Sequence, residues 1–406
     1  MEGTSSRDAH LKLRWILLLG LAVERMLVAW FSVGSDDVHT WKRFASTIDQ
    51  HGVLYCYRVL REYNHPPLMG YAAWLLLKLS KGTDLSFFWL FKLIPTVGDL
   101  IGAWALMSFR RTAARPPWMA VVLLAVSPVS VLITSHHGNT DSLCAGLSFL
   151  AAVLLYRQQF FWAGLAMAGA LNTKLIPMFL ALALLVQCRG RRQWLPYVAG
   201  LSIGLIPYLP FLLAAREEIY RNMVAYNSSS DHWGLWGVFD YLSRTPNIGP
   251  FMAKAALFYR SAGRWVLLAG TFALALWTRH NRRSSVEVGT LVSSAFLILA
   301  PGFGVQYLVY PLLFLIAVDS FEAVAFSIVG GAYLLTIYGG YWKPGVPYET
   351  PFTTALQPGP SLVGYLVWVL LVRFNVAFVF RRTAALQTAP LSHPSVDTAS
   401  GSDQHA

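Results

Sequence analysis

The chain has 406 residues, of which 55% are apolar and only 13% are charged, and its mean hydropathy is +0.48. A soluble protein of this length carries about a quarter charged residues. The composition therefore excludes a disordered chain, a disulfide scaffold and an ordinary soluble enzyme, and indicates a protein embedded in lipid. The net charge of +12 lies in short runs of Lys and Arg between apolar stretches, a pattern typical of the loops that orient a multispanning protein and not of a nucleic-acid surface.

The apolar segments predict an all-α, polytopic membrane protein with about twelve spans, since a span needs about 20 mostly apolar residues. They are expected near 13–34, 66–80, 85–109, 117–134, 140–156, 160–187, 194–214, 264–279, 286–300, 305–318, 322–340 and 361–380. Arg7, Lys12 and Arg14 precede the first segment, which is expected to be a retained anchor with a cytoplasmic N-terminus.

The basic runs test this count, because Lys and Arg accumulate in cytoplasmic loops. Four runs fall on the cytoplasmic side if 160–187 crosses once: Lys78 with Lys81, Arg189 with Arg191 and Arg192, Arg279 with Arg282 and Arg283, and Arg381 with Arg382. The run Arg110, Arg111 and Arg115 would then lie outside. It would move inside if 160–187 were two short helices turning at Asn172-Thr173-Lys174, but the parity from the first loop would break. We predict a single crossing, kinked at Pro177.

This topology predicts one integral membrane domain over 1–382, with outer loops at 35–65, 215–263 and 341–360. The tail 383–406 is rich in Ser, Thr, Ala and Pro without periodicity, and is expected to be disordered and cytoplasmic. Cys56, Cys144 and Cys188 are far apart, which favours small apolar fillers over a metal site.

The first outer loop carries adjacent carboxylates, Asp36 and Asp37, at the predicted membrane surface, together with His39 and His65. From Val38 to His51 the apolar residues recur at helical spacing, which predicts an amphipathic helix on the bilayer, ended by Gly52. The two acids fit a helix N-cap with a first-turn acid, and they equally fit a catalytic pair.

Charges inside the predicted spans are costly and usually have a purpose. They are Glu24, Arg25, Lys92 and Asp99. Lys92 and Asp99 are two helical turns apart, so they share a face but are too distant for contact, and each is expected to pair with another helix. Lys174 precedes an apolar run and could neutralise a phosphate or extend its amine to the interface.

Three later segments are polar or aromatic in a way that suits a site. The turn at 136–141 holds His137, Asn139 and Asp141, but by the span count it lies on the cytoplasmic side, away from Asp37. Either it is a structural turn that joins two spans, or a nearby span is misread and the turn faces the site. Gln306 could hydrogen-bond sugar hydroxyls, and Tyr307 could stack on a sugar ring or belong to an interfacial aromatic belt. The loop 226–236 interleaves aromatic and short polar residues and includes His232, a possible proton-transfer or phosphate group.

The order of these motifs resembles the GT-C superfamily of multispanning glycosyltransferases, which use polyprenyl-phosphate sugars. The features are the acid pair at 36–37, NHPPL at 64–68, Lys92 with Asp99, SPVSVLITSHHGNTDSL at 127–143, KLIP at 174–177 and PGFGVQYLVYPL at 301–312. They cover about 300 residues, and the bacterial mannosyltransferase-like branches are the most similar.

The resemblance implies an inverting transfer of a sugar, a mannose-like hexose, from a polyprenyl-phosphate donor to a lipid-linked glycan, glycolipid or protein outside the cytoplasmic leaflet. Asp37 then matches the general base, and Asp36 could assist it or hold a divalent metal in branches that need one. A partly desolvated neighbour would raise the pKa of such a base. Candidates to stabilise the leaving phosphate are Lys92, Lys174, Arg110 and Arg111.

Two other functions fit the composition. A secondary transporter would explain many spans and intramembrane charges, but it predicts matching halves and short loops, whereas here the long polar segments carry the acids and aromatic residues. An accessory subunit with a degenerate site is the third interpretation.

Overall fold

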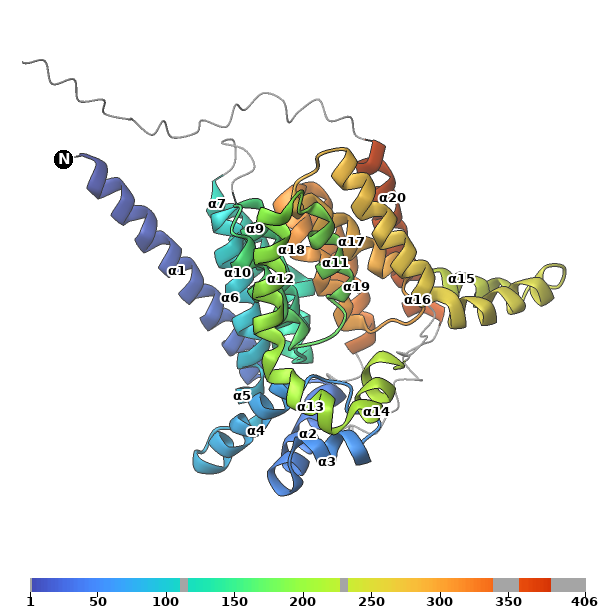
Figure 1. Ribbon diagram of the computed structural model, residues 1–406, viewed down its shortest axis with the longest axis horizontal. Coiled ribbons are helices and arrows are strands. Elements are labelled where there is room, and N and C mark those ends of the chain that lie inside the picture. Colours follow the sequence, from blue (N-terminus) through green and yellow to red (C-terminus); the bar gives the residue numbers. More distant parts are fainter. Residues whose placement is uncertain (1, 110–115, 227–232, 339–357, 381–406) are drawn as a thin grey trace, which may run out of the picture.

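The computed structural model describes residues 2–109, 116–226, 233–338 and 358–380, and every regular element in these ranges is helical, as predicted. Figure 1 shows a bundle of helices running between two ends, a layer of short helices across one end, and a hairpin that projects sideways. The tail 383–406, the run at 110–115, His232 and most of the predicted loop 341–360 lie outside the described residues.

The bundle contains the longest and most apolar elements. Its members are α1 (Glu2–Trp30), α6 (Leu93–Ser108), α7 (Pro117–Ala125), α8 (Pro128–Val131), α9 (Asp141–Tyr156), α10 (Phe160–Leu171), α11 (Met178–Gln187), α12 (Arg191–Leu205), α16 (Gly249–His280), α17 (Ser285–Leu299), α18 (Val309–Val318), α19 (Ser320–Tyr338) and α20 (Pro358–Phe380). Among the described residues, four helices are long and apolar enough to cross a membrane: Phe87–Ser108, Arg191–Ala214, Ser320–Tyr338 and Leu362–Phe380. The pair Pro117–Ala125 and Pro128–His137, bent by 54°, is a fifth candidate.

The layer covers what we call the layer end of the bundle, where residues 32–35, 136–141 and 172–177 lie. It comprises α2 (Asp36–His51), α3 (Val53–Val59), α4 (Pro67–Gly82), α5 (Phe87–Phe91), α13 (Leu209–Ala214) and α14 (Arg216–Ile219). The helix predicted after the acid pair is α2, which begins one residue after Ser35 and ends where Gly52 adopts a φ of +81°. Its apolar face is buried in a hydrophobic cluster of the layer, through Val38, Trp41, Phe44, Ala45 and Ile48.

The prediction of a span at 66–80 is wrong, because α4 belongs to the layer. It packs along α2, and Asp49 of α2 receives ion pairs from Lys78 Nζ at 2.6 Å and Lys81 Nζ at 2.7 Å. The two lysines therefore lie on the side of the molecule that carries Asp37, and not at the opposite end of the bundle.

The prediction of one crossing over 160–187 is also wrong, because α10 and α11 form an antiparallel pair that turns at 172–177. At the turn, Lys174 Nζ bonds Asp141 at the start of α9, which is at the layer end. At the other end of α11, Gln187 Nε2 donates to Thr278 Oγ1 near the end of α16. The start of α10 and the end of α11 thus both lie at the end of the bundle opposite the layer.

The turn between α10 and α11 is held by close packing of α10 on α12. A Cβ at Gly164 would lie 2.0 Å from the Tyr197 carbonyl oxygen, and a Cβ at Gly200 would lie 2.0 Å from that of Phe161. Small residues of this kind allow two backbones to approach closely, as in membrane helix pairs. Asn172 Nδ2 then donates to the Gly204 carbonyl at 2.8 Å, which ties the turn to α12.

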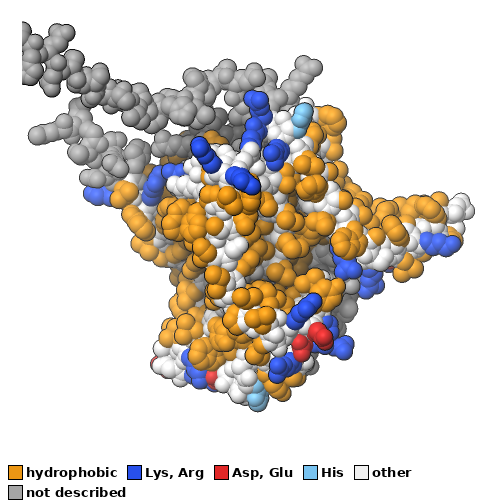
Figure 2. All heavy atoms as spheres, in the orientation of Figure 1, with side chains coloured by type: hydrophobic (Ala, Val, Ile, Leu, Met, Phe, Trp, Pro, Cys, Tyr) orange, Lys and Arg blue, Asp and Glu red, His pale blue; other side chains and the backbone are white. Residues whose placement is uncertain are grey.

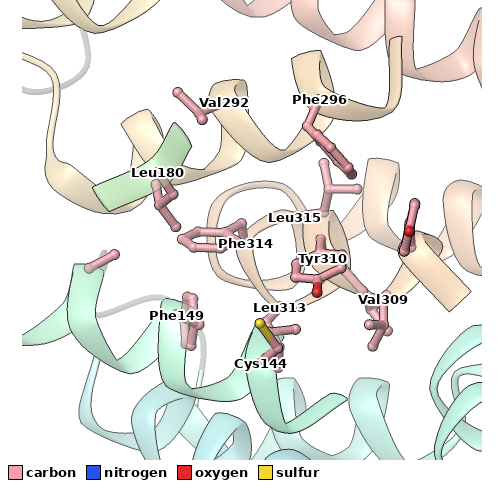
Figure 3. Packing of buried hydrophobic residues seen from close by; sticks show 14 of the residues in the cluster. Cys144, Phe149, Leu180, Val292, Phe296, Val309, Tyr310, Leu313, Phe314 and Leu315 are labelled. Carbon is pink, nitrogen blue, oxygen red and sulfur yellow. The ribbon is translucent and has the colours of Figure 1, made fainter. Parts of the chain in front are cut away.

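The bundle core lies where α9, α11, α17 and α18 meet. Figure 3 shows Phe149 of α9 facing Phe314 of α18, with Leu180 and Val292 beside them, and the two rings make an edge contact at 5.1 Å. Cys144 is buried in the same cluster, and Cys56 and Cys188 are also buried and free. All three therefore fill space as small apolar groups.

Arg25 of α1 is fully buried and binds the bend between α7 and α8. Its Nε donates to Asp99 Oδ2 at 2.7 Å, and its Nη2 donates to the Leu124 carbonyl and to Ser130 Oγ at 2.9 Å. Nη1 pairs with the neighbouring Glu24. The freed carbonyl of the bend thus finds a charged donor inside the bundle, where water is absent.

We predict that Arg25→Met destabilises the fold by about 3–5 kcal/mol, because it leaves the Asp99 carboxylate as an unpaired buried charge. The free energy of unfolding in detergent micelles is the measurement. The double variant Arg25→Met/Asp99→Leu removes both charges and should recover part of the loss. A change below about 1 kcal/mol in the single variant would contradict this role.

Candidate functional site

The site is built on a short turn that follows the bend. A π-helical segment, Leu132–His137, ends at Gly138, whose φ of +72° reverses the chain. A Cβ there would lie 2.7 Å from Val38 Cγ2, so only glycine lets the turn approach the start of α2. Ser35 N and Oγ both donate to the His137 carbonyl, at 3.3 and 3.0 Å, and join the two segments.

Asp37 is the carboxylate at this junction. His137 Nε2 lies 2.9 Å from Asp37 Oδ2, and Asn139 Nδ2 donates to the same oxygen at 2.5 Å. Asn139 is oriented in turn, because its Oδ1 accepts from Thr140 N at 2.6 Å and from Trp41 Nε1 at 3.4 Å. Since 38% of the Asp37 side chain is exposed, the carboxylate is fixed from one side and open on the other. Of the two alternatives for the 136–141 turn, the structure therefore shows the one in which the turn faces Asp37.

The environment separates the two adjacent acids. Burial raises the pKa of Asp37, but the hydrogen bond and charge of His137 and the charge of Lys174 outweigh it and lower this pKa to about 2. Partial burial and the negative charge of Asp37 raise the pKa of Asp36, although the Asp36 side chain is exposed. The expected rise in the pKa of the base is therefore found on Asp36 and not on Asp37. Both acids lie in the first turn of α2, but Ser35 supplies the N-cap oxygen.

A second buried group lies beside the first, on the same turn. Asp141 receives Lys174 Nζ at 3.0 Å on both carboxylate oxygens, and Tyr310 Oη donates to its Oδ1 at 2.9 Å. The Lys174 amine also lies 4.9 Å from the centre of the Tyr307 ring. The Asp141 carboxylate is thus committed to a tertiary contact between α9, α18 and the α10–α11 turn, and it caps no helix.

The remaining candidates lie at different distances from Asp37. The His65 ring packs on Trp41 with ring centres 4.3 Å apart. Burial lowers the pKa of His65 to about 3, so the imidazole is neutral. His39 contacts Phe88 on the outer side of α2. Gln306 is half-buried in the 3₁₀ segment Val305–Leu308, next to Tyr307.

Lys92 and Asp99 do not contact each other, as their spacing predicts, and the Lys92 side chain lies beside Gly138, where a Cβ would be 3.1 Å from its Cε. Lys92 Nζ donates to the Ser32 carbonyl at 2.6 Å, where α1 ends. Ser32 Oγ lies 2.7 Å from His136 Nδ1, so the end of α1 is held from two sides. Asp99 belongs to the Arg25 network in the bundle. These residues position the segment before Asp37 and do not line the site.

Two contacting residues were not singled out from the sequence. Trp41 was read only as part of the apolar face of α2, although its indole N–H reaches Asn139. Tyr310 lies three residues after Tyr307, on the same helical face, and that spacing could have identified it. Among the described residues, no group of three or more His, Cys, Asp or Glu side chains is placed to hold a metal ion.

An all-helical protein with several apolar helices long enough to cross a membrane and an anchored carboxylate at one end is the setting expected for a membrane glycosyltransferase. A model of glycosyltransferase family 87 matches residues 63–301, more than half of the chain. The chain belongs to glycosyltransferase family 87 and is an enzyme that transfers sugars, which confirms the predicted resemblance. A search of curated proteins gave no match.

We predict that His137→Phe raises the pKa of Asp37 from about 2 toward the ordinary aspartate range, because it removes the imidazole hydrogen bond, the largest of the effects that lower this pKa. With a depressed pKa, the charge persists until pH falls through that pKa, so the variant should lose it at higher pH. Infrared difference titration of isotope-labelled aspartate, assigned with Asp37→Asn, gives the measurement. His39→Phe is the control, and an unshifted titration in His137→Phe would reject the assignment.

Proposed function

We propose that the enzyme is an inverting transferase that takes a mannose-like hexose from a polyprenyl-phosphate donor and passes it to a lipid-linked glycan, glycolipid or protein on the non-cytoplasmic face. The observation that carries this proposal is the Asp37 carboxylate, ionised and fixed by His137 and Asn139 yet open on one side. A hydroxyl attacking an anomeric carbon needs such an acceptor for its proton.

In this proposal the two carboxylate oxygens of Asp37 have separate tasks. Both hydrogen bonds from the turn go to Oδ2, and Oδ1 accepts none from the described residues. In the proposed step the acceptor oxygen forms the new bond to the anomeric carbon, its proton passes to Oδ1, and the bond to the donor phosphate breaks with the electron pair on the phosphate oxygen. His137 keeps the carboxylate ionised before the step and holds its orientation during it.

Among the candidates for the leaving phosphate, Lys174 has the best support. Its charge acts on Asp37, and it is buried beside the turn, whereas the Lys92 amine is occupied by carbonyls at the end of α1. Asp141 compensates the Lys174 charge when no substrate is bound, and a phosphate would take over part of that role. In this proposal Gln306 and Tyr307, in the 3₁₀ segment that precedes α18, contact the sugar from the bundle side, and the short distance from Tyr307 to the Lys174 amine supports this.

Asp37→Asn should lower kcat by about 10²- to 10⁴-fold, the usual contribution of a general base, with little change in KM for the donor. Asp36→Asn is the matched control and should keep most of the activity. The assay offers the purified protein a panel of polyprenyl-phosphate hexoses and pentoses with membrane lipid extract, and mass spectrometry identifies the product. Full activity of Asp37→Asn would reject the base, and no transfer by the unmodified chain from any donor would favour an accessory subunit.

We further propose a revised topology that still has twelve crossings. Removing 66–80 as a span and dividing 160–187 into two leaves the count unchanged, and α1, α6, the α7–α8 pair, α9, α10, α11, α12 and α16–α20 then cross in turn. The runs at 110–115, 189–192, 279–283 and 381–382 all fall on the cytoplasmic side, and the layer lies outside. Support comes from the positive-inside rule, because the run at 110–115 moves inside. Lys78 and Lys81 move outside with the layer, where their charges are paired with Asp49.

Single cysteines test which face the layer occupies. A membrane-impermeant maleimide should label Lys78→Cys in intact cells and should label Arg191→Cys only after permeabilisation. The parent chain is the control, since its three cysteines are buried. Labelling of both positions from the same side would overturn the proposed sidedness.

A further inference from the structure

A side arm leaves the bundle beside the layer end. It comprises α15 (Gly234–Leu242) and the first half of α16, up to Arg264, and Figure 1 shows it projecting sideways at a steep angle to the bundle helices. In Figure 1 the second half of α16 follows the bundle. The arm is therefore outside the core but continuous with a helix that packs on α11 and α17.

One side of the arm is apolar and has no protein cover among the described residues. Phe251, Phe258 and Trp265 are spaced by seven residues, so they form a single stripe along α16, and they are 70%, 68% and 62% exposed. Tyr241 of α15 is 68% exposed. Large aromatic residues of this kind collect at the boundary between lipid and water.

Another side of the arm is basic. The segment 234–264 contains Arg244, Lys254, Arg260 and Arg264 against a single acid, Asp240, which pairs with Arg244 at 3.2 Å. Arg260 lies two residues after Phe258, about 200° around the helix, and Arg264 is four residues further on the same face. Lys254 is three residues after Phe251 and four before Phe258, so it lies beside the aromatic stripe, from which its flexible side chain extends its amine to the headgroups. Neither Lys254 nor these two arginines pairs with a carboxylate in the described part of the chain.

The two sides are oriented differently with respect to the bundle. Figure 2 shows hydrophobic side chains along the edge of the arm that faces the body of the bundle, and Lys and Arg along the edge that faces the layer. A helix with this division lies in the membrane interface, with its apolar face in the acyl region and its basic face among the headgroups. Attraction to phosphate of anionic lipids is worth roughly a factor of five in binding for each basic residue near the surface.

We propose that the side arm lies flat in the headgroup region on the layer side of the membrane and binds anionic phospholipids through Lys254, Arg260 and Arg264. The arm would thus gather negatively charged lipids on the side of the membrane that carries the layer. This inference concerns a lipid-binding surface and goes beyond the proposed transfer reaction, and it holds whichever sugar is moved.

The test uses the full-length protein in nanodiscs, with a fluorophore on Asn247→Cys at the tip of the arm. The three native cysteines are buried, so the fluorophore reacts at position 247. Brominated phosphatidylcholine and brominated phosphatidylglycerol, at equal mole fractions, serve as quenchers. We expect quenching by both lipids and stronger quenching by phosphatidylglycerol, with a preference that falls as salt is raised. A probe on Gln50→Cys, at the end of α2, is the control position and should not be quenched.

The triple variant Lys254→Gln/Arg260→Gln/Arg264→Gln should bring the ratio of the two quenching signals to one. A charge-preserving variant, Lys254→Arg/Arg260→Lys/Arg264→Lys, should keep the preference, which separates loss of charge from loss of fold. Neutralising Arg191, Arg192 and Arg282 at the opposite end of the bundle should also keep it. Absence of quenching at position 247, or equal quenching by the two lipids in the unsubstituted arm, would overturn the proposal, and neither result depends on catalytic activity.

Discussion

The hydrogen bonds that His137 and Asn139 make to Asp37 connect two parts of the molecule that are about a hundred residues apart in the chain. Asp37 comes from the layer, and its two partners come from the bundle. Three nearby features bring these side chains together. They are the bend between α7 and α8, the positive φ of Gly138, and the hydrogen bonds that Lys92 and His136 make to Ser32 at the end of α1. Hydrogen bonds to an ionised carboxylate are stronger than those between neutral groups. The two donors can hold Asp37 in one position only if the layer and the turn are both rigid.

Rigidity of this kind is difficult to obtain in lipid, because every break in a helix frees backbone groups that water cannot satisfy. The chain meets this demand with long polar side chains from neighbouring helices. Arg25 covers the carbonyl of Leu124, and Asn172 Nδ2 donates to the carbonyls of both Ala168 and Gly204. Charges that seem out of place in an apolar sequence therefore mark the positions where helices are interrupted, and the interruptions in turn deliver Asn139 and Lys174 to the layer end.

The order of motifs along the chain predicts the membrane class and the family, and it selects Asp37, His137, Asn139 and Lys174 as candidates, because those signals are local: an acid pair after a span, a polar turn in an apolar region, a lysine before a proline. That the candidates lie together does not follow from the span count, which separates the 136–141 turn from Asp37. Sidedness could not be obtained in the same way. The segment 66–80 is apolar enough to read as a span, and only Asp49, 30 residues earlier, shows that Lys78 and Lys81 stay with the layer. The basic run at 110–115 was the one sequence feature that disagreed with the predicted topology, and its alternative, a turn at Lys174, is the arrangement found.

The layer and the bundle have separate hydrophobic clusters, one built on α2, α3, α4, α5 and α14, and the other on α6 and the helices that follow it in the bundle, with Leu21 of α1. Asp37 lies where the two clusters meet. A relative displacement of the two bodies by even a few tenths of an ångström would lengthen both bonds to Oδ2 at once, while leaving each hydrophobic interior intact. The proton affinity of the Asp37 carboxylate consequently depends on how the layer packs on the bundle, because both hydrogen bonds to Oδ2 cross the boundary between them.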